Sequence, residues 1–283
     1  MAIRIDGRAL GETISRGVGQ RAMMLHERGT KPRCCVIVAP DDEPGLLYAR
    51  ATQRKGEKLG IAIDVVELEG STAMPGALAA VNRASCDPLV HGIIIQRPLP
   101  RRYDEFELCS AIEPSKDVDG ANPLTYGMLM AARPTFVPAT AAAVIELLRL
   151  PYLPAISGAH AIVLGRSKVA GGPIAALLTA ADATVTLCHS RTRRLADLCR
   201  LGDIVIAAVG RPLFVTAEMV KPQATVIDVG TNVCAGRITG DVDAQAVDAV
   251  AAALSPVPGG VGPVTAAVLL RNVVSAAEDQ RPK

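Results

Sequence analysis

Short apolar runs alternate with longer stretches rich in alanine and leucine along the whole chain. The apolar runs are rich in Val and Ile, and they lie at 34–40, 62–70, 91–100, 160–167, 183–190, 202–210 and 224–230. Near-continuous runs of β-branched residues are typical of strands buried on both faces, and the stretches between them are long enough for helices. The pattern therefore predicts an α/β fold built on parallel sheets.

The strands fall into two series, which indicates two domains. The segment between them, 133–154, is expected to cross from one domain to the other, with a helix at about 139–150. The last amphipathic stretch, 263–280, predicts a helix that packs back on the first domain. We expect a first domain made of residues 1–138 plus 266–283 and a second made of 139–265.

Composition excludes several classes of protein. The net charge is only +2, and three Phe, four Tyr and no Trp offer few rings for stacking bases, which argues against nucleic-acid binding. No apolar run is long enough to span a bilayer, and the start "MAIRIDGRALGETISRG" has no signal-peptide core, so we expect a cytoplasmic protein. Seven cysteines without a CxxC pair favour buried reduced thiols, and four histidines show no ligand spacing, so no metal is expected.

The stretch 160–194 has the form of one βαβ unit that could bind a dinucleotide. The first strand is expected to end at Gly165, and Gly171-Gly172-Pro173 opens the next helix. Glycine lets a pyrophosphate approach the backbone, and a helix N-terminus offers free N–H groups and a positive dipole. The spacing departs from the strict GxGxxG pattern, so an ordinary strand–turn–helix unit remains the alternative.

The end of the following strand bears on the choice of dinucleotide. An NAD site would place an acidic residue there, whereas this chain has His189, Ser190 and Arg191. A hydroxyl beside arginines, together with Arg166 and Ser167 in the preceding turn, would suit a 2′-phosphate. The sequence therefore predicts NADP as the cofactor.

Several longer motifs resemble the methylenetetrahydrofolate dehydrogenase/cyclohydrolase family. They are "GIIIQRPLP", "KDVDGANPLTYGML", "VLGRSKVAGGPIAALL", "TVTLCHSRT", "KPQATVIDVGTN", "GDVD" and "PVPGGVGPVTAAVLLRN". The resemblance implies two α/β domains, the second a Rossmann-type NADP domain, with a cleft between them, in a subunit that is usually a homodimer. It also implies oxidation of 5,10-methylenetetrahydrofolate to the 5,10-methenyl cation with NADP, commonly followed by hydrolysis to 10-formyltetrahydrofolate.

The resemblance also implies site residues. Tyr48 resembles the tyrosine that packs against the folate ring system, Gln96 the glutamine near the reacting centre, and Asp119 the aspartate that recognises the pterin. A carboxylate suits that last role because it accepts two parallel hydrogen bonds. The loop 258–265 suits close approach to folate and nicotinamide. The remaining residues expected to bind substrate come from this loop and are Pro258, Gly259, Gly260, Val261 and Pro263. The remaining residues expected to bind the cofactor are Gly210, Thr231, Gly262 and Thr265.

Position 52 departs from the family pattern, because Thr52 stands where the lysine four residues after the tyrosine is expected. Hydride transfer moves no proton, but hydrolysis needs a group that shuttles one, and threonine is essentially unionisable. Lys55 lies seven residues after Tyr48 on nearly the same helix face and could reach back toward Thr52.

The hypothesis is therefore a dehydrogenase with weak or absent cyclohydrolase activity. Three alternatives remain. One is a bifunctional enzyme that uses Lys55 or another group. The others are a non-catalytic paralogue that binds folate and NADP, and a two-domain dehydrogenase with a non-folate substrate.

Overall fold

The computed structural model describes residues 1–40, 42–133, 135–234 and 236–280. Its internal contacts divide the chain into two compact units. Unit 1 comprises Met1–Glu12 and Pro138–Thr265, and unit 2 comprises Thr13–Val137 and Ala266–Lys283. Two helices, α1 (Gly7–Glu27) and α10 (Val261–Asp279), carry residues of both units.

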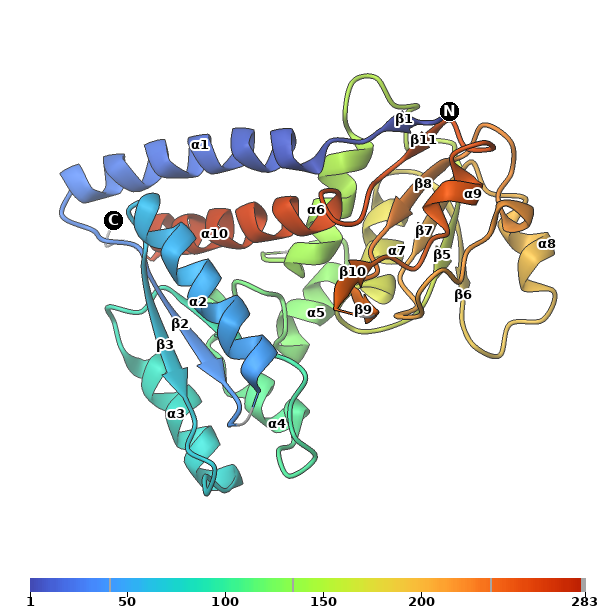
Figure 1. The fold of residues 1–283 in the computed structure, drawn as a ribbon. Helices are drawn as coiled ribbons and strands as arrows, with labels where there is room; N and C mark the ends of the chain where they lie inside the picture. Colours follow the sequence, from blue (N-terminus) through green and yellow to red (C-terminus); the bar gives the residue numbers. More distant parts are fainter. Residues whose placement is uncertain (41, 134, 235, 281–283) are drawn as a thin grey trace. The chain divides into compact units, whose positions relative to one another are not determined.

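Unit 1 is built on a six-stranded parallel sheet with the order β1-β11-β8-β7-β5-β6 (Figure 1). Strands β6 and β7 flank β5 on opposite sides. Chain connections therefore diverge next to β5, which makes its carboxyl end a topological switch point. The strands are β1 (Ile3–Arg4), β5 (His160–Leu164), β6 (Thr184–Cys188), β7 (Ile204–Ala207), β8 (Thr225–Asp228) and β11 (Ala253–Leu254).

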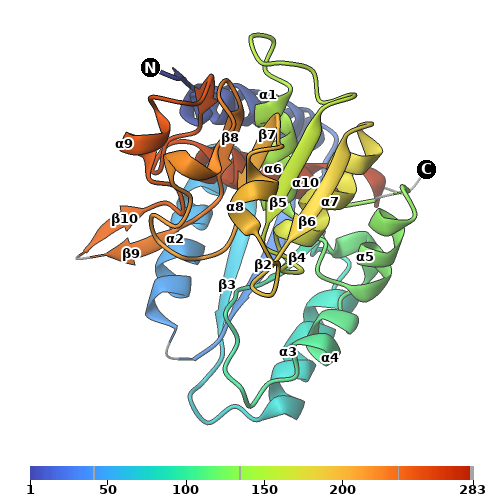
Figure 2. The ribbon, with the colours of Figure 1, turned by 90° about the vertical axis from the view of Figure 1, so that its right-hand side faces the viewer.

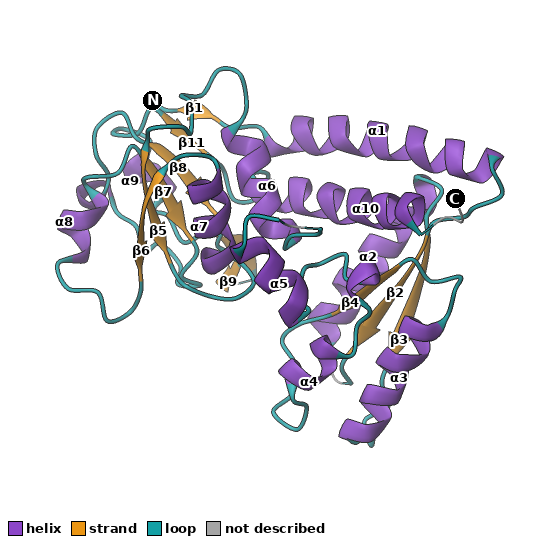
Figure 3. Ribbon diagram, turned by 180° about the vertical axis from the view of Figure 1, so that it is seen from behind, coloured by secondary structure: helices purple, strands orange, loops and turns teal. Residues whose placement is uncertain are grey.

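Short helices and one hairpin complete unit 1 (Figure 3). Helices α6 and α7 contact each other, and α7 packs on β5 and β6. The alanine-rich sequence of α6 lets nearly all of it be buried. The elements are α6 (Ala139–Leu148), α7 (Gly171–Ala180), α8 (Leu195–Cys199), the 3₁₀ helix η2 (Ala217–Met219), the antiparallel pair β9 (Asn232–Cys234) and β10 (Arg237–Thr239), and α9 (Ala244–Val247).

Unit 2 has a three-stranded parallel sheet with the order β3-β2-β4. Helix α3 packs its alanine face on one side of this sheet and α2 covers the other (Figures 1 and 2). The elements are β2 (Arg33–Val38), α2 (Glu43–Lys58), β3 (Ala62–Glu67), α3 (Met74–Cys86), β4 (Gly92–Ile95), α4 (Glu105–Ser110), the 3₁₀ helix η1 (Pro114–Lys116) and α5 (Pro123–Met130).

All seven strands singled out in the sequence are present, as are the helices expected at about 139–150, after Gly171 and at 263–280. Each strand is shorter than its apolar run, as with β4, which ends at Ile95 although the run continues to residue 100. The residues beyond the strand ends leave the sheet and form loops. Periodicity alone does not distinguish such a loop from a strand when both are apolar.

The observed units differ from the expected domain division at residues 1–12. Strand β1 pairs with β11, and the Ile3 and Ile5 N–H groups donate to Ala252 O at 2.7 Å and Leu254 O at 3.0 Å. This main-chain pairing places the start of the chain in unit 1. A strand of two residues has no detectable periodicity, so the sequence pattern could not reveal it.

The cysteines largely match expectation. All seven are free thiols, and five are buried, but Cys86 at the end of α3 is exposed. Over the described residues, no helix is long and apolar enough to cross a bilayer. The same residues contain no group of three or more side chains placed to hold a metal ion.

Candidate functional site

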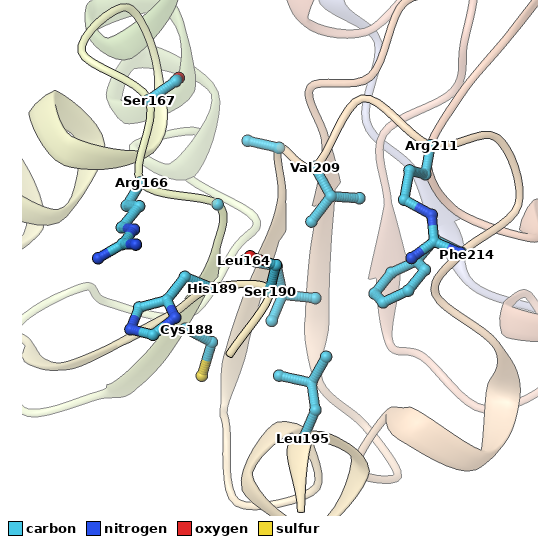
Figure 4. Close-up of a pocket in the computed structure, with 12 residues that line it drawn as sticks. Leu164, Arg166, Ser167, Cys188, His189, Ser190, Leu195, Val209, Arg211 and Phe214 are labelled. Carbon is cyan, nitrogen blue, oxygen red and sulfur yellow. The ribbon is translucent and has the colours of Figure 1, made fainter. Parts of the chain in front are cut away.

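Unit 1 contains a pocket of about 280 Å³ at the carboxyl ends of β5, β6 and β7 (Figure 4). It lies at the switch point, which is where open α/β sheets bind their ligands. The loops that follow these three strands form its wall. The lining residues are Leu164, Gly165, Arg166, Ser167, Cys188, His189, Ser190, Leu195, Ala208, Val209, Arg211 and Phe214.

Glycines make the turn after β5 possible. Gly165 has a φ of +108°, and a β-carbon there would lie 2.0 Å from Ala208 O. A β-carbon on Gly171 would lie 1.9 Å from Gly165 O. The turn therefore packs backbone against backbone, as a cradle for a pyrophosphate requires. The Gly172 N–H donates to Ser167 O at 3.0 Å, which closes the turn into the start of α7, where Pro173 follows.

Most, but not all, of the polar residues predicted to bind the ribose 2′-phosphate line this pocket. Arg166, Ser167, His189 and Ser190 line it, and Figure 4 shows Arg166 and His189 on the same side. Arg191 is exposed and outside the lining, although its N–H donates to His189 Nδ1 at 3.2 Å. The other predicted cofactor residues also lie outside the lining: Gly171, Gly172, Pro173, Gly210, Thr231, Gly262 and Thr265.

The opposite wall holds a pair that sequence reasoning missed. The Arg211 guanidinium lies over the Phe214 ring at 4.7 Å from its centroid (Figure 4). Such a cation–π contact restrains an exposed arginine at the edge of the pocket. Both residues follow β7 in a loop without a recognisable motif, so only the structure shows that they face the pocket.

Two buried carboxylates fix the backbone beside this wall. Asp241 Oδ2 accepts from the N–H groups of Val209 at 2.6 Å and Gly210 at 2.8 Å. Asp228 accepts from Gly230 and Asp241 N–H groups at 2.9 Å each, and from that of Val242 at 3.0 Å. Burial, with a smaller effect of the Asp241 charge, raises the pKa of Asp228 to about 6. These hydrogen bonds hold the loop after β7 in place.

In unit 2, the predicted substrate residue Tyr48 lies on α2, and Gln96 lies beside the first turn of that helix. A β-carbon on Gly45 would lie 2.9 Å from Gln96 Cγ, so the first turn of α2 contacts the end of β4. Burial and, to a lesser extent, the negative charge of Asp119 raise the pKa of the Tyr48 phenol. The Tyr48 side chain is still 42% exposed.

Asp119 faces an arginine that sequence reasoning also missed. Arg97 Nη1 lies 3.8 Å from Asp119 Oδ2, and Arg97 Nε lies 3.1 Å from Glu105 Oε1. The nearby Asp117 is buried and accepts from the Ala121 and Asn122 N–H groups at 2.8 Å each. Asp117 thus stabilises the turn, whereas Asp119 is directed toward Arg97.

Thr52 is only 6% exposed, and its hydroxyl donates to Tyr48 O at 3.0 Å, one turn back along α2. Lys55 is half-buried, and burial lowers its pKa. Within the described residues, no carboxylate forms an ion pair with Lys55. The two groups therefore differ in their capacity to move a proton.

The glycine-rich loop predicted to approach substrate belongs to unit 1. The Val257–Pro258 peptide bond is cis, Gly259 has a φ of +113°, and the Gly260 N–H donates to Pro256 O at 2.7 Å. Val261 begins α10, and Pro263 and Gly262 follow in its first turn, where the Thr265 hydroxyl donates to Val261 O at 3.1 Å. This loop is a tight, hydrogen-bonded turn into a helix.

Comparison with known proteins covers both units. Residues 5–119 match the model of the tetrahydrofolate dehydrogenase/cyclohydrolase catalytic domain, and residues 138–281 match that of the NAD(P)-binding domain. A relative from Parafrankia sp. (strain EAN1pec), named bifunctional protein FolD, is 49% identical over 274 residues, or 96% of this chain and 98% of the relative.

Two solved structures show the same fold. The bifunctional FolD enzyme from Campylobacter jejuni has a TM-score of 0.96 and 34% identity, covering 99% of this chain and 100% of its own. The Trypanosoma brucei enzyme, complexed with NADP cofactor and inhibitor, has a TM-score of 0.94 and 37% identity, covering 98% of each chain. The glycine turn, the switch-point pocket and these matches agree, and the chain belongs to the tetrahydrofolate dehydrogenase/cyclohydrolase family.

Proposed function

We propose that this chain oxidises 5,10-methylenetetrahydrofolate to the 5,10-methenyl cation, with NADP as the hydride acceptor, and hydrolyses that cation weakly or not at all. Family membership supports a folate substrate over that of another two-domain dehydrogenase. The proposal of weak or absent hydrolysis rests on one observation: the Thr52 hydroxyl is buried and donates to a carbonyl of its own helix.

The pocket in unit 1 fits NADP. The turn at Gly165 and Gly171 leaves no room for β-carbons and would let a pyrophosphate lie against the backbone. Arg166 and the Ser190 hydroxyl, both lining the pocket, would hold the ribose 2′-phosphate, and no acidic residue is among the lining residues to favour a 2′-hydroxyl. We expect NADP to bind at least about tenfold more tightly than NAD.

The substrate residues of unit 2 have roles in binding and orientation. The exposed part of the Tyr48 ring would pack against the folate ring system, and Asp119 would accept hydrogen bonds from the pterin. Gln96, at the end of β4, would contact the reacting end of the substrate. Hydride transfer requires this alignment and no proton shuttle.

Hydrolysis makes a demand that Thr52 does not meet. Water must be activated and a ring nitrogen protonated, so a group must gain and lose a proton near neutral pH. The Thr52 hydroxyl is essentially unionisable, and its one proton is engaged with Tyr48 O. The relatives named bifunctional support hydrolysis in the family, and Thr52 argues against it in this chain.

Lys55 supports a second candidate function, a bifunctional enzyme. Its pKa is lowered by burial, which is the property a proton-shuttling lysine needs. It lies three residues after Thr52, so the two side chains are neighbours on the helix surface. Lys55 would then carry the proton that Thr52 cannot.

A paired assay on one preparation tests both candidates. NADPH formation from methylenetetrahydrofolate measures oxidation, and decay of added methenyltetrahydrofolate, corrected for the buffer rate, measures hydrolysis. We expect oxidation without enzymatic decay. Decay at a rate comparable to oxidation would refute the proposal, and its loss in K55M would identify Lys55 as the shuttle. Absence of both activities would indicate a binding protein.

A further inference from the structure

A largely buried arginine lies among the predicted substrate residues without an assigned role. The Arg97 side chain is 20% exposed and that of Asp119 is 21% exposed. Arg97 follows Gln96, one residue beyond the end of β4. A cation is rarely buried to this degree unless other groups compensate its charge.

Arg97 contacts two sets of groups, which are side chains of α4 and the carboxylate of Asp119. Its Nε lies 3.1 Å from Glu105 Oε1, and its Nη2 donates to Cys109 Sγ at 3.9 Å. Both partners belong to α4, which holds the guanidinium by an ion pair and a long thiol contact, while Nε has no hydrogen-bond partner among the described residues. The 3.8 Å separation from Asp119 Oδ2 is too long for a hydrogen bond. Arg97 therefore acts on Asp119 through its charge rather than by occupying an acceptor site.

We propose that Arg97 is a positioning residue for pterin recognition, which keeps the Asp119 carboxylate ionised and directed toward the substrate. This inference rests on the proposed function, since it assigns Asp119 to the pterin. An ionised carboxylate accepts two hydrogen bonds, whereas a protonated one loses an acceptor site to its own proton. Arg97 would thus affect substrate binding without touching the reacting carbon.

Among the described residues, the titratable groups shown to interact with the pair are neutral or acidic. Tyr48 and Cys34 face Asp119, and burial raises the pKa of both, so each stays neutral at pH 7. Glu105, Cys109 and Asp117 face Arg97. A positive charge this close favours the ionised form of a carboxylate, so removing Arg97 should make Asp119 easier to protonate.

Three variants separate charge from structure. R97M removes the cation but keeps an apolar stem, and R97K keeps a positive charge without the planar fork. R101M is the matched control, because Arg101 is an exposed arginine in the same loop. Affinity for tetrahydrofolate is measured anaerobically by calorimetry over about pH 5 to 8, together with kcat and KM for methylenetetrahydrofolate. Affinity for NADP and the melting temperature report whether each variant is folded.

For R97M we expect the Kd of tetrahydrofolate and KM to rise about tenfold, with a much smaller change in kcat. The acid limb of the binding profile is the pH range in which tetrahydrofolate affinity falls as Asp119 is protonated. In R97M this limb should lie about one pH unit or more higher than in the wild type, and R97K should restore it toward the wild-type position. R101M should match the wild type in all of these measurements.

Two results would overturn the role of Arg97. One is an acid limb and Kd in R97M equal to those of R101M, and the other is an equal loss in R97K and R97M. The binding measurement does not require turnover. If the wild type binds tetrahydrofolate but forms no NADPH, the proposed reaction fails while the role of Arg97 is still decided.

Discussion

One side chain on α2, Thr52, distinguishes the two half-reactions of the family at the scale of a residue. Its hydroxyl donates to Tyr48 O, one turn back along the same helix, so its only proton is already engaged. The position is 6% exposed and faces the interior of unit 2. A lysine placed there would be partly desolvated, which lowers an ammonium pKa toward the working pH.

We therefore predict that T52K gains methenyl hydrolysis. The rate of enzymatic decay should rise about tenfold or more above that of the wild type, because general acid–base catalysis contributes at least that much. Oxidation should change by no more than a few-fold. T52V, which removes the hydroxyl without adding a base, is the control and should gain nothing. A T52K enzyme that oxidises substrate normally but remains unable to hydrolyse it would contradict the role given to this position.

Gly165 provides a second prediction about a single residue. An alanine there would meet Ala208 O at 2.0 Å and would also adopt a φ of +108°. We expect G165A to lose stability by about 2–4 kcal/mol and to lose most NADP affinity, as measured by denaturant unfolding and titration. Gly158 is a matched control, since its φ is +79° but no atom lies within 4 Å of an added β-carbon. Equal effects of G158A and G165A would show that backbone strain, and not the clash, determines the loss.

Among the elements, the loop after β7 is held by side chains that come from later in the chain. Asp241 accepts from the Val209 and Gly210 N–H groups, and Asp228 accepts the Asp241 N–H. Sequence patterns predicted the strands because apolar runs record burial directly. They could not predict these contacts, nor Arg97 or Arg211 facing the sites, because tertiary packing brings them together from distant positions.

The raised pKa of Asp228 predicts how stability depends on pH. Burial raises this pKa from 3.8 to about 6, so the folded protein binds the proton more tightly than the unfolded chain. The stability gained from that proton is present at acid pH and is lost as pH rises through about 6. Between about pH 5 and 7 the wild type should lose about 1 kcal/mol more unfolding free energy than D228N, measured by denaturant titration. Parallel profiles for the two proteins would rule out this contribution.

At the scale of the whole molecule, the sequence predicted two α/β units and seven of their strands. Family motifs singled out Tyr48, Gln96 and Asp119, and the structure places Gln96 beside the first turn of the helix that carries Tyr48, and Asp119 beside Arg97. The boundary was less predictable, because the first twelve residues join unit 1 through a strand of two residues. The homodimer implied by the resemblance stays a prediction.

The binding of NADP should be visible in the unfolding of the whole chain. A ligand at about 100 times its Kd stabilises the folded state by about 2.7 kcal/mol, which corresponds to several degrees in melting temperature. At the same concentration NAD should produce a shift smaller by the equivalent of about 1.4 kcal/mol or more, if its affinity is tenfold lower. Replacing Arg166 by glutamine should reduce the NADP shift and leave the NAD shift nearly unchanged. Equal shifts for the two dinucleotides in the wild type would contradict the cofactor preference.

The pairing of β1 with β11 has a consequence for biosynthesis. The edge strand Ile3–Arg4 is made about 250 residues before its partner Ala253–Leu254. Unit 2 also takes in Ala266 and the residues after it, but its three strands all lie within residues 33–95. The sheet of unit 1 should therefore be completed late, and a ribosome stalled before residue 253 would leave β8 as an open edge for chaperones to protect.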